Sequence, residues 1–244
     1  MAVKIGSARI DENGKAKGGK AGDQTGKEVS TQNWYLHSKG WRVFRAIDPS
    51  RASKIAWDMA NACENNNIGY DQGQRNTLYT QAEKVGFNCA AVKTKCETDC
   101  SALVRVCCAY AGIMLPNFRT DTEPNVLLKS GYFEEMKGTK YQDSSDYLCV
   151  GDILVTKKQG HTVVVLTNGK YAENRETEYN TVLVTGGSVN VRAQPKTSGK
   201  VYGIAHKGDT FPYLGEMVDN RWFKIRYKEK DAYISNRYSH LIMK

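Results

Sequence analysis

A cysteine at the predicted start of a helix is the residue best placed to act as a nucleophile. Cys100 follows Thr98 and Asp99, either of which can cap the helix that comes next. A thiolate there would lie near the positive end of the helix dipole, which lowers the thiol pKa. The free amides of the first turn could also hold the oxyanion formed when a thiolate attacks an acyl carbon. The alternative is a small buried cysteine like Cys107 and Cys108.

A histidine and a glutamate on predicted strands are the candidate partners of Cys100. His161 begins an apolar strand at the rim of a sheet, where an imidazole can accept the thiol proton and return it to a leaving amine. Asn168-Gly169 predicts a hairpin into a third strand over Lys170–Glu173, which would put Glu173 beside His161 to orient the ring. An exposed surface residue is the alternative for both His161 and Glu173.

The elements that must position these residues are helices followed by an antiparallel sheet. Asp48 can cap a helix with an apolar stripe over Ile55–Cys63, and strands are predicted at Asp152–Thr156 and His161–Leu166. This order is typical of an α+β fold. From about Val182 onward, short alternating segments separated by turns predict a small all-β barrel.

The chain is therefore expected to hold two domains. Residues 1–178 would form a catalytic domain with an N-terminal extension, and residues 182–244 would form the barrel. A short polar join, Asn174–Asn180, lies between them. The first forty residues are rich in glycine and predict loops and short strands, and the sequence assigns no role to residues 1–47.

Composition excludes several classes of protein and suggests an anionic partner. The 244 residues are 40% hydrophobic and 25% charged, which excludes a collagen-like or wholly disordered chain. The net charge is +9, and residues 181–244 hold 11 Lys and Arg against 5 Asp and Glu, or +6. A nucleic-acid binder is a rival interpretation of this charge, but the sequence offers no recognition helix, zinc spacing or basic run.

Targeting and metal signals are missing from the sequence. No stretch reaches the roughly 18 apolar residues of a membrane span, and charges interrupt the N-terminus where a signal peptide needs its apolar core. We therefore expect a reducing compartment and free thiols. Cys96 and Cys100 are four residues apart without a second pair, so neither a metal nor a cofactor is expected.

Three motifs, taken in order, resemble those of a known enzyme family. They are Thr98-Asp99-Cys100-Ser101-Ala102-Leu103-Val104, Val150-Gly151-Asp152-Ile153-Leu154-Val155 and Gly160-His161-Thr162-Val163-Val164-Val165. Together they resemble the NlpC-type cysteine peptidases of the papain-like clan, over roughly Ile68 to Glu173. Ala102 replaces the usual glycine of that family.

The resemblance implies helices packed on an antiparallel sheet and a set of site residues. Cys100, His161 and Glu173 would be catalytic, and Tyr70, in Gly69-Tyr70-Asp71-Gln72, would assist the oxyanion. Asp99 and Ser101 would line the substrate groove, although capping alone is a sufficient role for Asp99.

The C-terminal segment is similar to bacterial SH3-like domains. The similar stretches are Ser188-Val189-Asn190-Val191-Arg192, Gly208-Asp209-Thr210, Arg221-Trp222-Phe223-Lys224-Ile225 and Ala232-Tyr233-Ile234. Such domains bind cell-wall peptide or glycan, which implies cell-wall contacts at Tyr213, Trp222 and Tyr233. The alternative for these aromatic residues is the core of the barrel.

The two resemblances together imply a peptidoglycan hydrolase that cuts an amide bond in the stem peptide. The expected cut is between D-glutamate and the diamino acid. An N-acetylmuramoyl-L-alanine amidase with the same site is one alternative, and a catalytically inactive wall-binding protein is another. Without a signal peptide, the expected source is a phage or prophage endolysin. Such an enzyme would stay in the host cytoplasm until a separate, holin-like pore releases it to the wall.

Overall fold

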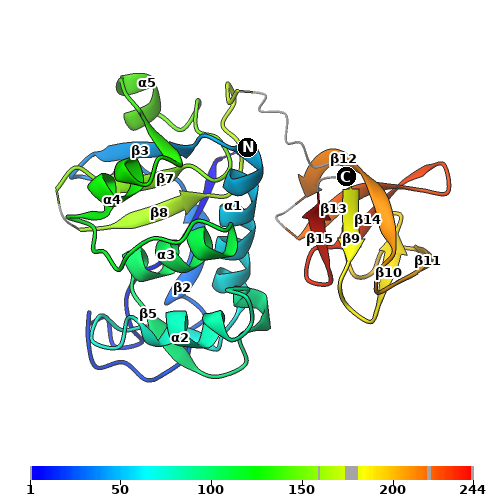
Figure 1. The fold of residues 1–244 in the computed structure, drawn as a ribbon, viewed down its shortest axis with the longest axis horizontal. Coiled ribbons are helices and arrows are strands. Elements are labelled where there is room, and N and C mark those ends of the chain that lie inside the picture. The colour runs from blue at the N-terminus through cyan, green and yellow to red at the C-terminus, as the bar shows by residue number, and fades with distance from the viewer. Residues whose placement is uncertain (1, 159, 174–180, 219–220, 243–244) are drawn as a thin grey trace. The chain divides into compact units, whose positions relative to one another are not determined.

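The chain forms two compact units, Met1–Asn174 and Arg175–Lys244 (Figure 1). The computed structural model describes residues 2–158, 160–173, 181–218 and 221–242. The join expected at Asn174–Asn180 lies outside the described residues. The first unit mixes helices with an antiparallel sheet and the second is built of strands. The α+β class expected from the sequence is confirmed.

A six-stranded antiparallel sheet with the order β2-β1-β8-β7-β3-β6 forms the centre of the first unit. Its strands are β1 (Lys4–Ala8), β2 (Val29–Asn33), β3 (Trp41–Ala46), β6 (Phe133–Met136), β7 (Ile153–Thr156) and β8 (Thr162–Val165). Strand β8 pairs with β7 on one side and with β1 on the other. The segment before residue 47 therefore supplies three of the six strands.

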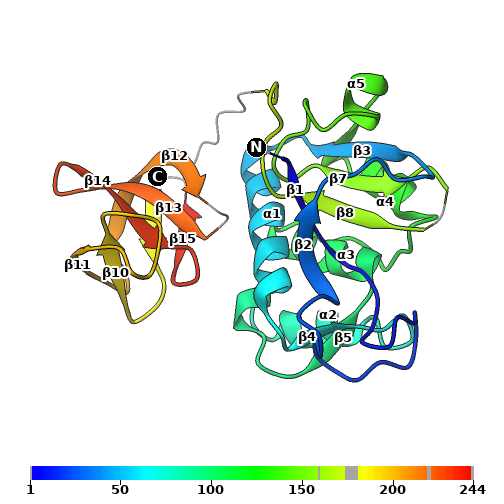
Figure 2. The same cartoon turned by 180° about the vertical axis from the view of Figure 1, so that it is seen from behind.

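The two faces of this sheet bury different side chains, because successive residues of a strand point to opposite sides. Ile153 and Val164 join the larger core, which packs under helices α1 (Pro49–Glu64) and α3 (Cys100–Tyr110). Leu154 and Val163 join a smaller core together with Tyr141 of the short helix α5 (Thr139–Gln142). Figure 1 shows α3 in front of the sheet, and Figure 2 shows β1 and β2 in front of α3.

Both long helices begin at capping aspartates. The Asp48 carboxylate accepts a hydrogen bond from the N–H of Ser50, and the Asp99 carboxylate accepts one from the N–H of Ala102. Of the two caps that the sequence allowed for α3, Asp99 is the one used. The remaining helical segments are α2 (Thr77–Glu83), the 3-10 helix η1 (Cys89–Ala91) and α4 (Glu123–Lys129).

A separate pair of parallel strands leads directly into α3. Strand β4 (Ile68–Tyr70) pairs with β5 (Cys96–Thr98), and Tyr70 lies opposite Thr98. This register brings Tyr70, which is 30 positions earlier in the chain, beside the start of α3.

The third strand expected over Lys170–Glu173 does not form. The edge of β8 that such a strand would use is occupied by β1. The chain after β8 instead makes turns, in which the N–H of Gly169 donates to the carbonyl of Leu148 and the N–H of Tyr171 donates to that of Asp146. The sequence predicted a local hairpin where the fold uses a distant N-terminal strand.

The Gly151-Asp152 motif ahead of β7 has a structural basis. Asp152 is fully buried and binds Arg45 of β3 through two hydrogen bonds, Nε to Oδ1 at 2.8 Å and Nη2 to Oδ2 at 2.7 Å. Gly151 has a φ of 84°, and a Cβ at this position would overlap the backbone of Ala52 in α1. Only glycine accepts both the positive φ and the lack of space for a Cβ at position 151.

The second unit is a seven-stranded sheet with the order β11-β10-β14-β13-β12-β9-β15. Its strands are β9 (Thr181–Val184), β10 (Ser188–Arg192), β11 (Val201–His206), β12 (Thr210–Val218), β13 (Trp222–Tyr227), β14 (Lys230–Ser235) and β15 (Ser239–Ile242). Val191, Phe223, Ile225 and Ile234 are at most 1% exposed and belong to its core. Among the described residues of the chain, no helix has the length and apolar character needed to cross a membrane.

We predict that Gly151→Ala lowers the free energy of unfolding by at least about 3 kcal/mol, because it adds steric overlap to an unfavourable φ. Gly131→Ala is a matched control with a φ of 74° and nothing within 4 Å of its Cβ, so it should cost only about 1 kcal/mol. Chemical denaturation measures both values. Equal losses would contradict the packing role of Gly151.

Candidate active site

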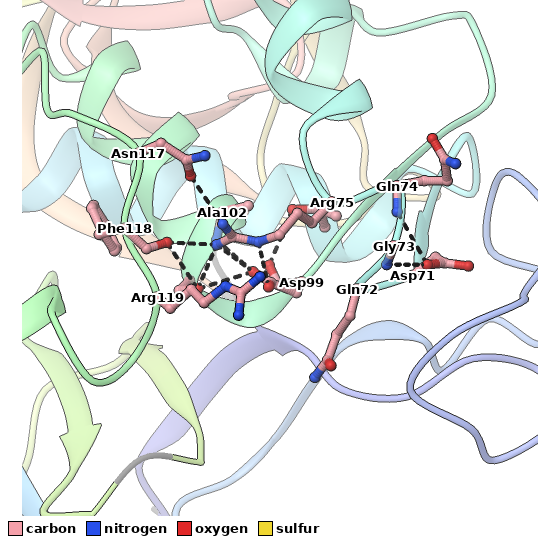
Figure 3. A network of polar contacts seen from close by, with 12 residues as sticks. Asp71, Gln72, Gly73, Gln74, Arg75, Asp99, Ala102, Asn117, Phe118 and Arg119 are labelled. Carbon is pink, nitrogen blue, oxygen red and sulfur yellow. Dashed lines mark hydrogen bonds and ion pairs between the residues drawn. The ribbon is translucent and has the colours of Figure 1, made fainter.

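The start of α3 is held by a buried network around Arg75 (Figure 3). The Arg75 guanidinium donates to Asp99 twice, from Nε to Oδ2 at 2.5 Å and from Nη2 to Oδ1 at 3.1 Å. It also donates to Ser101 Oγ at 2.8 Å, to the carbonyl of Phe118 at 2.6 Å and to Asn117 Oδ1 at 2.9 Å. One cation therefore ties the chain before α2 and the loop after α3 to the turn that carries Cys100.

Asp99 and Ser101, which were expected to line the substrate groove, have their side chains inside this network. They are 7% and 2% exposed, and the Ser101 hydroxyl donates to Asp99 Oδ1 at 3.0 Å. Because Asp99 also caps α3, both side chains hold the helix start in place. This arrangement supports the capping alternative for Asp99.

Cys100 lies at the first position of α3 and is 6% exposed. Burial raises the pKa of its thiol above the usual range, and the carboxyl groups of Asp99 and Glu123 raise it further. Hydrogen bonds from the backbone N–H groups of Thr162 and Ser101 act in the opposite direction. The lowered thiol pKa expected from the helix dipole is therefore wrong, because loss of solvent outweighs the few N–H groups that face the sulfur.

His161 lies directly before β8, where its N–H donates to Thr156 Oγ1 at 3.0 Å. Its ring packs against Trp41, with 6.5 Å between the ring centroids. Burial lowers the pKa of His161 to about 4, and the positive charges of His37 and Arg9 add to this effect. The imidazole is therefore neutral across the physiological pH range and can accept a proton.

Cys100 and His161 come together through adjacent backbone positions. One of the two backbone N–H groups that hydrogen-bond the Cys100 sulfur belongs to Thr162, the residue after His161. Within the described part of the chain, no hydrogen bond joins the sulfur to the imidazole itself. The structure thus brings the Cys100 sulfur, at the start of α3, to the start of β8, next to the backbone of His161.

Two tyrosines lie close enough to Cys100 that a negative charge on its sulfur raises the pKa of their hydroxyl groups. Tyr70 is 4% exposed, its hydroxyl accepts from Gln72 Nε2 at 3.1 Å, and burial together with the Cys100 charge raises its pKa to about 12. Tyr35 is 38% exposed, and its pKa is raised by burial and, more weakly, by Cys100. Both hydroxyl groups therefore remain protonated hydrogen-bond donors at neutral pH.

Glu173 does not lie beside His161, in contrast to the expectation from the hairpin. Its carboxylate is 59% exposed and pairs with Arg45 Nη1 at 3.3 Å, at the Asp152 end of β7. His161 lies at the other end of β7, beside Thr156. Four residues of extended chain, roughly 13 Å, separate the two ends. Glu173 is therefore not placed to orient the imidazole.

Several site residues were missed from the sequence because they lie far from the motifs. Arg9 and Trp41 reach His161 through the pairing of β1 with β8 and of β3 with β7. His37 also packs on Trp41, with 5.2 Å between ring centroids. No local pattern gives these contacts, because the partner of a strand depends on residues far away in the sequence.

No group of three or more His, Cys, Asp or Glu side chains is arranged to hold a metal ion among the described residues. All seven cysteines are free thiols.

The three aromatic residues expected at the cell-wall surface of the second unit are not equally exposed. Trp222 is 7% exposed and lies in the core between β12 and β14. Tyr213 and Tyr233 are half-buried, and Tyr213 packs edge-on against Phe223. Among the described residues of this unit, the exposed aromatic ones are Tyr202 (37%), on the edge strand β11, and Tyr238 (42%). Burial in a small barrel explains the position of Trp222.

We predict that the C2 proton of His161 titrates with a pKa of about 4 by NMR. Arg9→Gln should raise this pKa towards 6.5, because it removes a positive charge that disfavours the imidazolium. His161→Gln assigns the resonance, and Lys84→Gln, at an exposed lysine that bonds only Gln81, should leave the pKa unchanged. A wild-type value at or above 6.5 would contradict the burial of the ring.

Two protein families match the chain. The endolysin-like domain matches residues 5–172, and the bacterial SH3 domain matches residues 187–240. Neither the curated proteins nor the solved structures gave a significant match. The first match covers more than half of the chain and includes Cys100, His161 and all of the six-stranded sheet except Lys4. The chain therefore belongs to the family of endolysin-like domains and carries a bacterial SH3 domain behind it.

Proposed function

We propose that this protein is a peptidoglycan hydrolase that cleaves an amide bond of the stem peptide with Cys100 as nucleophile and His161 as general base. Its two family matches support a wall-degrading enzyme. The observation that carries the chemistry is the position of the Cys100 sulfur, at the first turn of α3 and facing the N–H next to His161.

Both reacting groups are neutral before substrate binds, because burial raises the pKa of the Cys100 thiol and lowers that of His161. The thiol therefore gives its proton to the imidazole as the sulfur attacks the carbonyl carbon. The hydrogen bond between a nucleophile and its base often becomes short only when substrate is bound. Because the Cys100 thiol and the His161 imidazole are both neutral at rest, the proton moves from sulfur to nitrogen only when the sulfur–carbon bond begins to form.

The negative charge that forms on the carbonyl oxygen needs donors at the start of α3. The backbone N–H groups of the first turn are one source, and the protonated hydroxyl of Tyr70 is the second. This role for Tyr70 is supported by its position opposite Thr98, two residues before Cys100.

The tetrahedral intermediate then collapses to a thioester. The carbon–nitrogen bond breaks, and the imidazolium of His161 gives its proton to the leaving amine. Water, deprotonated by the neutral imidazole, attacks the thioester carbon. The carboxylic acid product leaves, and the Cys100 thiol regains its proton.

The motif resemblance favours cleavage between D-glutamate and the diamino acid. Cleavage between muramic acid and L-alanine would use the same steps, because both bonds are amides. The two activities differ only in which part of the stem peptide the groove holds.

The second unit would hold the enzyme on the wall. Its exposed surface on β11 carries Tyr202 and Ile204, and the ammonium of Lys230 lies 5.6 Å from the Tyr202 ring centroid. An apolar ring next to a cation suits a peptide or glycan within an anionic polymer. The wall contact therefore lies at Tyr202 and Ile204 on β11 and not at Trp222, which is buried.

We predict that Cys100→Ala reduces release of peptidoglycan fragments by at least about 1,000-fold, because no other group can form the thioester. Iodoacetamide should inhibit the wild type, and EDTA should not. Mass spectrometry of the fragments identifies the bond: a new N-terminus on the diamino acid indicates an endopeptidase, and one on L-alanine indicates an amidase. Full clearing of walls by Cys100→Ala would overturn the proposal, and wild-type protein that binds walls without cutting them would identify an inactive binder.

We predict that Tyr202→Ala weakens binding to purified cell walls by about 5- to 10-fold, the usual effect of removing an aromatic contact. Tyr238→Ala removes a similarly exposed tyrosine that also lies beside a cation, Arg237, but outside β11, and should leave binding unchanged. Co-sedimentation of inactive Cys100→Ala protein with walls measures both. Equal binding by the two variants would exclude the β11 surface.

A further inference from the structure

A buried carboxyl group close to Cys100 has no part in the steps above. Glu123 begins α4 and is fully buried. Its Oε1 accepts a hydrogen bond from the hydroxyl of Thr162 at 2.9 Å. Its Oε2 is buried without a hydrogen-bond partner among the described residues. A buried carboxyl with a free oxygen is costly, so its presence calls for a reason.

Thr162 connects this carboxyl to the nucleophile. The side chain of Thr162 binds Glu123, and the backbone N–H of the same residue faces the Cys100 sulfur. Thr162 is fully buried at the first position of β8, directly after His161. The bond to Glu123 therefore holds the first residue of β8, which follows His161, beside the Cys100 sulfur.

Burial favours the neutral form of Glu123 and raises its pKa well above the usual range. The hydrogen bond from Thr162 and the Arg75 guanidinium lower the pKa and the Asp99 carboxylate raises it, but burial has the largest effect. The thiols of Cys100 and Cys108 also lie within its electrostatic range. An ionised Glu123 would place a second negative charge next to the thiolate.

We propose that Glu123 is a positioning residue of the active site, which holds Thr162 so that its backbone N–H stays directed at the Cys100 sulfur. This inference rests on the proposed function, in which the sulfur is the nucleophile. Glu123 performs this task as a neutral acid: its Oε1 accepts from Thr162, and it adds no charge that would oppose ionisation of the thiol. It touches neither substrate nor the reacting atoms.

Three variants separate this role from a purely structural one. Glu123→Gln keeps the acceptor and the neutral charge, Glu123→Ala removes both oxygens, and Thr162→Val removes only the hydroxyl donor. The first readout is the rate of iodoacetamide alkylation of Cys100 as a function of pH, followed by mass spectrometry of the peptide that contains it. The second is kcat and KM on peptidoglycan fragments.

We expect Glu123→Gln to alkylate with the wild-type pH profile and to keep kcat within about 3-fold. Thr162→Val and Glu123→Ala should shift the alkylation profile to higher pH, because the thiolate loses its hydrogen bond from Thr162. They should also lower kcat about 10-fold or more, with little change in KM. Because Glu123→Ala removes buried contacts and can fail to fold, Thr162→Val carries the test in that case.

Asp58→Asn is the matched control. Asp58 is a fully buried carboxyl of α1 that accepts from the N–H of Cys89 at 2.8 Å, away from the site. It should change stability without moving the Cys100 profile. A shift to lower pH in both Glu123 variants would show an ionised carboxylate and overturn the proposal, as would unchanged profiles in Thr162→Val. Alkylation needs no catalysis, so this result stands apart from any failure of the hydrolase assignment.

Discussion

The buried ion pair between Arg75 and Asp99 is the interaction on which the site depends. Asp99 caps α3 through Ala102 and accepts from Arg75 twice, so the same carboxylate begins the helix and joins it to the chain before α2. A buried charge without its partner is strongly destabilising. The helix start, and with it the Cys100 sulfur, is therefore fixed by a contact between residues 24 positions apart.

Burial sets the chemical character of the site more than the helix dipole does. It raises the pKa of the Cys100 thiol and lowers that of His161, so both groups rest in their neutral forms. A resting ion pair would need stabilisation by solvent or by opposite charges, and the nearest charged groups act against it. Asp99 opposes the thiolate, and Arg9 opposes the imidazolium. In the proposed mechanism, proton transfer therefore accompanies attack by the sulfur and does not precede it.

The N-terminal segment is part of the active unit, although its sequence resembles a flexible extension. Strand β1 occupies the edge of β8 and brings Arg9 towards His161, and β3 supplies Trp41. The same segment carries Arg45, which closes the buried pair with Asp152 and also binds Glu173. In the proposed function, wall binding by the linked second unit would raise the effective concentration of this site at the wall, even when the affinity of that unit is modest.

Local patterns in the sequence determined the elements and the motif order, because helix caps, apolar periodicity and turn residues act over a few positions. They were sufficient for the α+β class, the capped helix that begins at Cys100, and the strand that follows His161. They did not determine which strand pairs with β8, because pairing depends on contacts between distant residues. For that reason Glu173 was predicted beside His161, whereas the fold fills that edge with β1. The pKa values of Cys100 and His161 were likewise decided by the tertiary structure, since desolvation depends on everything packed around a group and not on its neighbours in the chain.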